Sequence, residues 1–234
     1  MLMNNCEFGV FYQVYKNKKA PEAVLKNFRK YFPDNPIVMI SDGGKDFSDI
    51  AEKYDCSYFW RENIFGNEIN GYDRQCYDAT RTIEWWNRQK LVCDVCQKDY
   101  VMIVEDDVLF QGYFDIDQPF QLRGVKKSNK LTDPILREIA KCGYDGDYYG
   151  MCGGSMYNAR TLIEIYDDVI EDIRQNHDRL LSEELHFRPL GAVDCSITYH
   201  FNKRGHKYEA APWLGQVCEG NTHLPVVHQW KEHY

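Results

Sequence analysis

The sequence predicts an α/β protein built on one mainly parallel sheet with helices on its faces. Two observations lead to this prediction. Apolar segments typical of strands alternate with segments of helical periodicity through the first 110 residues. Two of the strand segments, 36–44 and 100–110, contain continuous apolar runs, which are typical of parallel strands buried on both faces. With 234 residues, 44% of them apolar, the chain is long enough to bury a core without disulfide bonds.

The elements of the first half follow from their local patterns. Residues 7–15 are rich in apolar and aromatic side chains and predict the first strand. A helix is predicted over Pro21–Phe32, because proline is favoured in a first helical turn and the apolar residues share one stripe. The remaining elements alternate in order: a strand at 36–44 ending in a glycine turn, a helix at 47–53, a strand at 56–60, a polar loop at 61–71, a helix at 72–91, and a strand at 100–110 that three acids interrupt.

The second half has a different pattern. A long loop of mixed charge is expected at 111–134, with an edge hairpin inside it. Helices are expected at 134–142, 161–185 and 192–205, with a segment rich in glycine and tyrosine at 143–160 and a mostly extended tail at 208–234. Because no linker or repeat divides the sequence, we expect a single domain over 1–234.

Charge and targeting signals exclude several classes of protein. The formal net charge of −8 argues against nucleic-acid binding and against a polybasic membrane anchor. No apolar run approaches the roughly 20 residues of a membrane span. The amino terminus also lacks the pattern of a signal peptide. These features predict a cytoplasmic protein.

The nine cysteines support the same compartment. Their number is odd and their spacing forms no framework, which fits reduced thiols. Cys93 and Cys96 form one CxxC without a second pair of ligands at the spacing of a zinc finger. Their role is left open between packing at a helix end and a zinc or redox function.

Three consecutive acids, Glu105, Asp106 and Asp107, follow the apolar run of the fourth strand. Adjacent carboxylates repel each other, and a divalent cation relieves the repulsion. Mg²⁺ and Mn²⁺ take oxygen ligands of this kind, and ligands of α/β proteins gather at the carboxyl ends of parallel strands. The cluster therefore predicts a cation site, with a solvated acidic turn as the alternative.

Asp42 occupies the corresponding position on the second strand. Its carboxylate is placed to accept hydrogen bonds from a nucleoside, and the two glycines that follow allow a sharp turn. The alternative is that Asp42 caps the next helix.

The order of these segments resembles that of the GT-A-fold glycosyltransferases. The stretch 36–63 is similar to their opening half, and Glu105-Asp106-Asp107 is similar to their metal-binding DxD motif, with Glu in first place. Gly153-Gly154-Ser155 resembles their acceptor-side loop, 192–194 their xED segment with Val193 in place of Glu, and 225–228 the segment of their carboxyl-terminal histidine. The resemblance spans about residues 7–230 and is strongest to the compact soluble transferases of large DNA viruses that build capsid glycans.

The resemblance implies a GT-A fold whose residues 1–110 bind a nucleotide sugar, with UDP the expected carrier, and whose residues 111–234 form the acceptor side. It implies Mn²⁺ or Mg²⁺ as cofactor, with Asp107 as principal ligand and Glu105 and His228 in the same shell. It implies donor contacts from eight residues: Gln13, Val14, Tyr15, Asp42, Arg74, Arg81, Glu105 and Asp106. Asp194 is implied as the base that takes the proton of a hydroxyl on a glycan or glycoprotein acceptor.

Several assignments keep an alternative. Asp194 can also serve as a helix cap, with Asp145 and Asp147 as other acids near the acceptor. His228 lies in an apolar run and is either a core residue or a ligand, and His223 competes with it. Trp213 is predicted to stack on a sugar ring.

Two other functions compete with sugar transfer. The acids also resemble the Mg²⁺ site of a receiver domain of bacterial signalling, although about a hundred residues precede them here. A non-catalytic module that binds a nucleotide or sugar is the other alternative.

Overall fold

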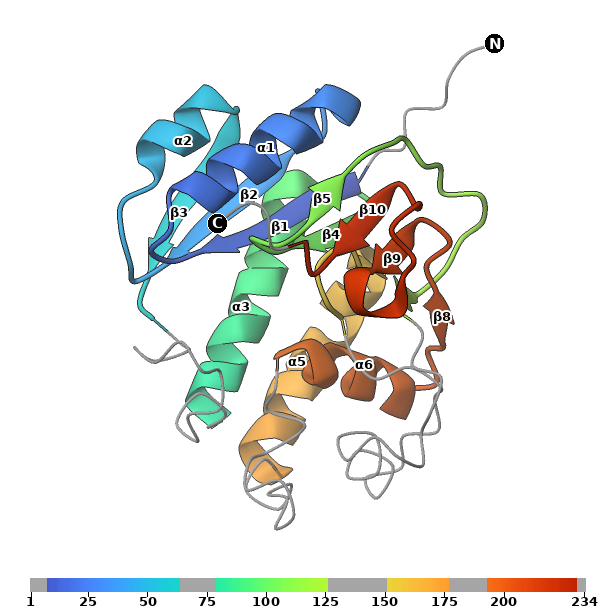
Figure 1. Ribbon diagram of the computed structural model, residues 1–234. Helices are drawn as coiled ribbons and strands as arrows, with labels where there is room; N and C mark the ends of the chain where they lie inside the picture. The colour runs from blue at the N-terminus through green and yellow to red at the C-terminus, as the bar shows by residue number, and fades with distance from the viewer. Residues whose placement is uncertain (1–7, 64–78, 126–150, 177–192, 231–234) are drawn as a thin grey trace.

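The computed structural model describes residues 8–63, 79–125, 151–176 and 193–230, with the side chains of 193–195 left out (Figure 1). Within these residues a seven-stranded sheet has the order β3-β2-β1-β4-β7-β6-β8. Its strands are β1 (Phe8–Val14), β2 (Ile37–Asp42), β3 (Cys56–Arg61), β4 (Tyr100–Val104), β6 (Leu122–Gly124), β7 (Met156–Asn158) and β8 (Tyr208–Ala210).

The sheet is mainly parallel, as the sequence predicted. β3, β2, β1 and β4 run parallel to one another, and β6 is parallel to β8. Among the described strands of this sheet, only β7 is antiparallel to its neighbours, β4 and β6. Because the first four strands are parallel, their carboxyl ends meet at one edge of the sheet, where Asp42 is the last residue of β2 and the three acids follow β4.

Two apolar layers hold helices against the two faces of the sheet. Figure 1 shows α1 (Lys19–Tyr31) and α2 (Ser48–Lys53) on one side, and α3 (Ala79–Cys96), α5 (Ala159–Asn176) and α6 (Val193–Lys203) on the other. Alternation along β1 explains the layers, because successive side chains of a strand face opposite sides. Tyr12 and Val14 belong to the layer with α1, whereas Phe11 belongs to the layer with α3 and α5. None of the helices in the described ranges combines the length and apolar composition that a membrane span requires.

A second, three-stranded sheet lies beside the acids. It consists of β5 (Leu109–Phe110), β10 (Val226–His228) and β9 (Leu214–Gln216), with β10 in the middle. β10 is antiparallel to β5 and parallel to β9. The single strand predicted at 100–110 is therefore wrong. The acids form a turn, closed by a hydrogen bond from the Val108 N–H to the Glu105 carbonyl (3.2 Å), and the chain leaves the large sheet for the small one.

Where they fall on described residues, the other predicted strands and the predicted helices agree with the structure in type and differ in their bounds. α3 continues to Cys96 rather than ending at residue 91, and α5 is described to Asn176. The hairpin predicted within 111–134 is absent from its described part, because β6 pairs with β7 and β8 instead. The helix predicted at 134–142 lies outside the described residues. A short 3-10 helix, Val217–Glu219, follows β9 in the tail.

Cys93 and Cys96 lie in the last turn of α3, and their thiols face different partners. The Cys93 thiol lies 3.9 Å from the Tyr157 hydroxyl, whereas the Cys96 thiol lies 3.7 Å from the Pro36 carbonyl. Burial raises the pKa of Cys93 to about 12 and that of Cys96 to about 11. Such thiols stay protonated at neutral pH, so the geometry favours packing over the zinc or redox function.

Candidate functional site

Glu105, Asp107 and His228 come together at the carboxyl end of β4. His228 Nε2 lies 3.1 Å from Glu105 Oε2 and 3.5 Å from Asp107 Oδ1. One potential ligand atom from each residue lies within 4.8 Å of the others, and no other set of three such residues does so in the described part of the chain. We refer to these three residues as the acid–histidine cluster. The sequence predicted the same three residues as metal ligands.

The small sheet places the histidine opposite the acids. β10 pairs with β5, which begins two residues after Asp107, and the Trp230 N–H donates to the Asp107 carbonyl (2.8 Å). Gly153 allows the approach, because a Cβ there would lie 2.5 Å from Val108 Cγ2 and 3.3 Å from His228 Cδ2. Gly153, which the family resemblance assigned to the acceptor-side loop, therefore packs against the cluster.

The charges of the cluster favour a cation. Burial lowers the pKa of His228, but hydrogen bonds to Cys152 and Glu105 raise it, to about 11. Cys152 and Glu105 thus favour a protonated imidazole, whose positive charge lies where a metal ion would otherwise balance the acids. Asp107 and His228 are buried, whereas the Glu105 side chain is 45% exposed and remains open to a ligand. Carboxylate oxygens and an imidazole nitrogen are a donor set that suits Mn²⁺ or Mg²⁺.

Asp106 turns away from the acid–histidine cluster. Its Oδ1 accepts a hydrogen bond from the Tyr12 hydroxyl on β1 (2.8 Å). Burial raises the pKa of the Asp106 carboxyl to about 6, against the lowering effect of this hydrogen bond. Asp106 therefore joins the turn to the large sheet. The first and third acids, Glu105 and Asp107, belong to the cluster, and their spacing is that of a DxD motif.

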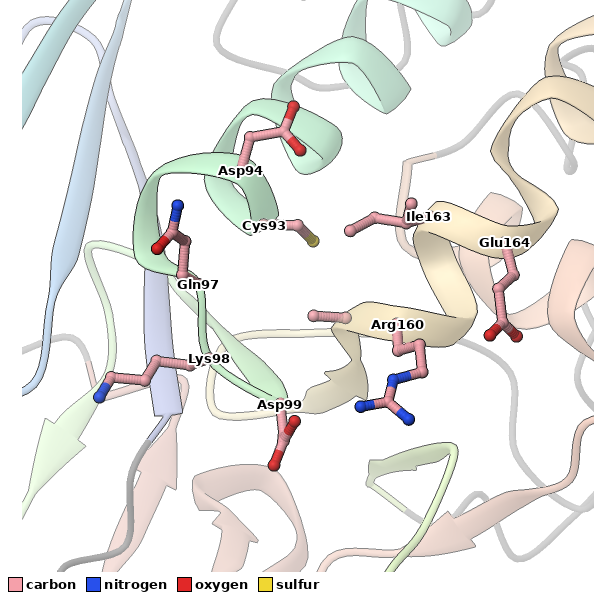
Figure 2. A pocket seen from close by; sticks show the side chains of 9 residues that line it. Cys93, Asp94, Gln97, Lys98, Asp99, Arg160, Ile163 and Glu164 are labelled. Carbon is pink, nitrogen blue, oxygen red and sulfur yellow. The ribbon is translucent and has the colours of Figure 1, made fainter.

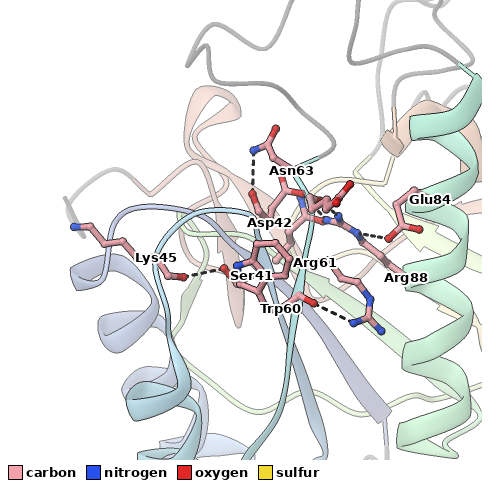
Figure 3. A network of polar contacts seen from close by, with 10 residues as sticks. Ser41, Asp42, Lys45, Trp60, Arg61, Asn63, Glu84 and Arg88 are labelled. Carbon is pink, nitrogen blue, oxygen red and sulfur yellow. Dashed lines mark hydrogen bonds and ion pairs between the residues drawn. The ribbon is translucent and has the colours of Figure 1, made fainter.

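A second polar group lies at the carboxyl ends of β1 and β2 and centres on Arg88 of α3 (Figure 3). Arg88 Nη1 donates to Asp42 Oδ1 (2.7 Å) and to Gln13 Oε1 (2.9 Å). Its Nη2 donates to the Glu62 carbonyl (2.5 Å), and its Nε to Glu84 Oε1 (3.3 Å). Arg88 is 1% exposed and Asp42 is 2% exposed. Through Asp42 on β2 and Gln13 on β1, Arg88 therefore fixes the ends of two neighbouring strands to α3.

Arg88 was not among the residues predicted for the site, although the sequence contains a signal for it. Arg88 lies three residues after Trp85 and four before Val92, on the buried stripe of a helix. A charged residue on such a stripe needs a buried partner, since burying an unpaired charge is costly. Asp42, already singled out by its position, is that partner.

The structure also places the other residues predicted to contact a donor. Val14 points into the core at 2% exposure, whereas the Tyr15 carbonyl accepts the Lys45 N–H (2.8 Å) beside Gly44. Arg81 is partly buried on α3, two turns before Arg88. Arg74 lies outside the described residues. Asp194 lies in the first turn of α6, with only its backbone described.

Trp213 does not stack on a ligand. It is 1% exposed, its ring stacks on Phe114 at a centroid distance of 4.9 Å, and its Nε1 donates to the Gly154 carbonyl (3.0 Å). This prediction was wrong because an exposed position was inferred from flanking proline and glycine. His223, the competitor of His228, is exposed and is not part of the cluster.

A hollow of about 580 Å³ lies between the end of α3 and the start of α5 (Figure 2). Lys98 and Arg160 line it together with three acids, Asp94, Asp99 and Glu164. It sits beside the loop that leads into β4, whereas the acid–histidine cluster follows the other end of that strand. The hollow is therefore separate from the candidate site, and its mixed charges indicate no class of ligand.

Comparison with known proteins identifies the fold. No family model and no curated protein matches the sequence. Mouse xyloside xylosyltransferase 1, in its apo form, matches with a TM-score of 0.55 and 8% identity, over 95% of this chain and 97% of that chain. The galactosyltransferase LgtC, in complex with donor and acceptor sugar analogues, matches with a TM-score of 0.55 and 14% identity, over 94% and 86% of the two chains. The chain has the predicted GT-A fold, and neither match supports the closer resemblance to viral capsid-glycan transferases.

Proposed function

We propose that this protein is a metal-dependent glycosyltransferase that moves a sugar from a nucleotide sugar, expected to be a UDP-sugar, to a hydroxyl of a glycan or glycoprotein. The acid–histidine cluster carries the proposal. It lies at the carboxyl end of β4, the edge where parallel α/β sheets hold their ligands. Its third member, His228, comes from the separate small sheet. A solvated acidic turn would not need a histidine from another sheet beside it.

Asp107, Glu105 and His228 would hold Mn²⁺ or Mg²⁺. The bound ion would supply Lewis acidity that neutralises the leaving diphosphate. Asp107 and His228 are buried and would fix the position of the ion, whereas the Glu105 side chain is 45% exposed and would remain accessible to a diphosphate. Arg81 and Arg74 are assigned to that diphosphate.

The nucleoside is assigned to the carboxyl ends of β1 and β2, next to the cluster. Gln13 and Tyr15 border this position, and Asp42 contributes through the arrangement that Arg88 imposes. The Val14 side chain lies in the core, and the Asp106 carboxylate accepts a hydrogen bond from Tyr12. These two residues therefore shape the region without side-chain contact to the donor. Asp194, at the start of α6, is assigned to remove the acceptor proton.

Thermal unfolding with UDP and UDP-sugars, with and without Mn²⁺, tests the proposal. A ligand at 100 times its dissociation constant stabilises a protein by about 2.7 kcal/mol. We expect such a shift for the wild type and for Asp49→Asn, an exposed acid of α2 that serves as a matched control. We expect Asp107→Asn to lose the Mn²⁺-dependent part of the shift and the transfer of sugar, while remaining folded.

Each contrary outcome has a definite meaning. If no nucleotide diphosphate shifts the melting temperature, the glycosyltransferase proposal is wrong. A shift with acetyl phosphate alone would favour the receiver alternative. Binding of UDP-sugars with no transfer to any hydroxyl acceptor would favour the non-catalytic module.

A further inference from the structure

Gln216 lies beside His228, on the side of the imidazole that faces away from the acids. The two residues are direct neighbours in the parallel pairing of β9 and β10, so their side chains project from the same face. Gln216 Nε2 lies 3.4 Å from His228 Nδ1, and Gln216 is 4% exposed. The two ring nitrogens are thus divided: Nε2 faces the carboxylates, and Nδ1 faces a buried amide.

A histidine that binds a metal ion through one nitrogen carries its proton on the other. That N–H group is regularly fixed by a hydrogen-bond acceptor, which sets the tautomer and orients the ring. If Nε2 of His228 is the ligand atom, Nδ1 needs an acceptor that does not depend on solvent, because the residue is 8% exposed. The amide of Gln216 contains such an acceptor in its Oε1 atom.

Two thiols flank the amide of Gln216. Its Nε2 donates to Cys152 Sγ (3.6 Å), and its Oε1 accepts from Cys218 Sγ (3.4 Å). A thiol is both a weak donor and a weak acceptor, so each can pair with either end of an amide. The amide therefore keeps partners whether it presents Nε2 or Oε1 to His228.

We propose that Gln216 is a positioning residue of the metal site, which holds the His228 ring by accepting a hydrogen bond from its Nδ1–H group while Nε2 binds the metal. The inference rests on the proposed function, because it presupposes a cation on the acid–histidine cluster. It extends that proposal to a residue that makes no contact with the acids themselves.

Mn²⁺ binding without nucleotide tests the inference through a readout that does not depend on catalysis. We expect Gln216→Met, which keeps the length of the side chain and removes its hydrogen bonds, to raise the dissociation constant of Mn²⁺ roughly 10–100-fold. Gln216→Glu retains an acceptor and should bind Mn²⁺ at least as tightly as the wild type. The matched control is Gln89→Met on α3, since Gln89 is also buried and its Oε1 accepts a hydrogen bond from the Tyr157 hydroxyl of β7 (2.9 Å).

A spectroscopic measurement separates positioning from stability. With Mg²⁺ bound and histidine labelled with ¹⁵N, we expect a protonated Nδ1 of His228 whose proton exchanges slowly in the wild type and in Gln216→Glu. In Gln216→Met the proton should exchange fast. Gln89→Met should lower the melting temperature but leave the Mn²⁺ affinity and the Nδ1 proton unchanged.

The outcomes distinguish the two proposals. If the wild type binds no Mn²⁺ or Mg²⁺, the proposed metal site and this inference are both wrong. If the wild type binds Mn²⁺ and Gln216→Met binds it equally well, or if Gln89→Met weakens binding as much, only the inference is overturned. The same holds if the Nδ1 proton of His228 is indifferent to the substitution at residue 216.

Discussion

The Arg88–Asp42 pair allows a quantitative test of what holds the candidate donor site together. Both side chains are almost fully buried, at 1% and 3% exposure, with a charged hydrogen bond of 2.7 Å between them. Replacing Arg88 by Met keeps the apolar stem and leaves the Asp42 carboxylate without its buried cation. Removal of one partner from a buried ion pair costs about 3–5 kcal/mol. In a protein of this size that loss lowers the melting temperature by about 6–20 °C.

Lys90→Met provides the control on the same helix. Lys90 pairs with Asp94 four residues away, and both side chains are exposed, at 37% and 51%. Pairs of this kind contribute about 0.3–0.5 kcal/mol. The expected loss in melting temperature is about 1–2 °C.

Denaturant and thermal unfolding of Arg88→Met and Lys90→Met measure how much stability each charge pair contributes. The double variant Arg88→Met with Asp42→Asn should be less destabilised than the sum of its single changes, by about 0.5–3 kcal/mol. If Arg88→Met loses no more stability than Lys90→Met, or if the two sites are strictly additive, the buried charge pair does not have the role assigned to it.

Three further predictions concern other charged groups. The hydrogen bonds from His200, Lys203 and Asn176 hold the pKa of Asp172 below its usual value. The free energy of unfolding that Asp172→Asn loses at pH 7 should therefore diminish as the pH falls below about 4. Urea unfolding of the wild type and the variant, at pH 7 and below pH 4, measures this difference. Because the pKa of His228 is raised to about 11 without a cation, Mn²⁺ binding at pH 7 should release a proton and weaken as the pH falls, which calorimetry in buffers of different ionisation enthalpy detects. Asp194→Asn should keep UDP-sugar affinity while transfer falls roughly 10²–10⁴-fold; near-normal transfer would remove Asp194 from the mechanism.

The fold was predictable where local periodicity and tertiary packing agree. β1, β2 and β4 contain apolar runs that only a buried strand accommodates, and the alternation with helices specified the parallel sheet. The bounds of the strand at 100–110 were wrong because the apolar residues on either side of the acids belong to two sheets. Nothing local in VLF indicates that its partner is the segment 226–228, more than a hundred residues away.

The same distinction applies to the site. Glu105 and Asp107 were recognisable because acids at the end of a buried strand conflict with their surroundings, and His228 followed from the resemblance in motif order. Gln216 carried no such conflict, since a glutamine in an extended segment is unremarkable until its register with His228 is known. The turn of Asp106 toward Tyr12 likewise depends on a contact across 94 positions in the sequence.

The position of β10 has a consequence for biosynthesis. Glu105 and His228 are 123 positions apart, and the strand that supplies the histidine is the last one in the described chain. When the first four parallel strands have emerged from the ribosome, four of the seven strands of the large sheet are present, but the chain still lacks His228, the third member of the acid–histidine cluster. The proposed cation site is therefore complete only when β10 has left the exit tunnel and inserted between β5 and β9, and a chain that stops before β10 lacks the histidine of the cluster.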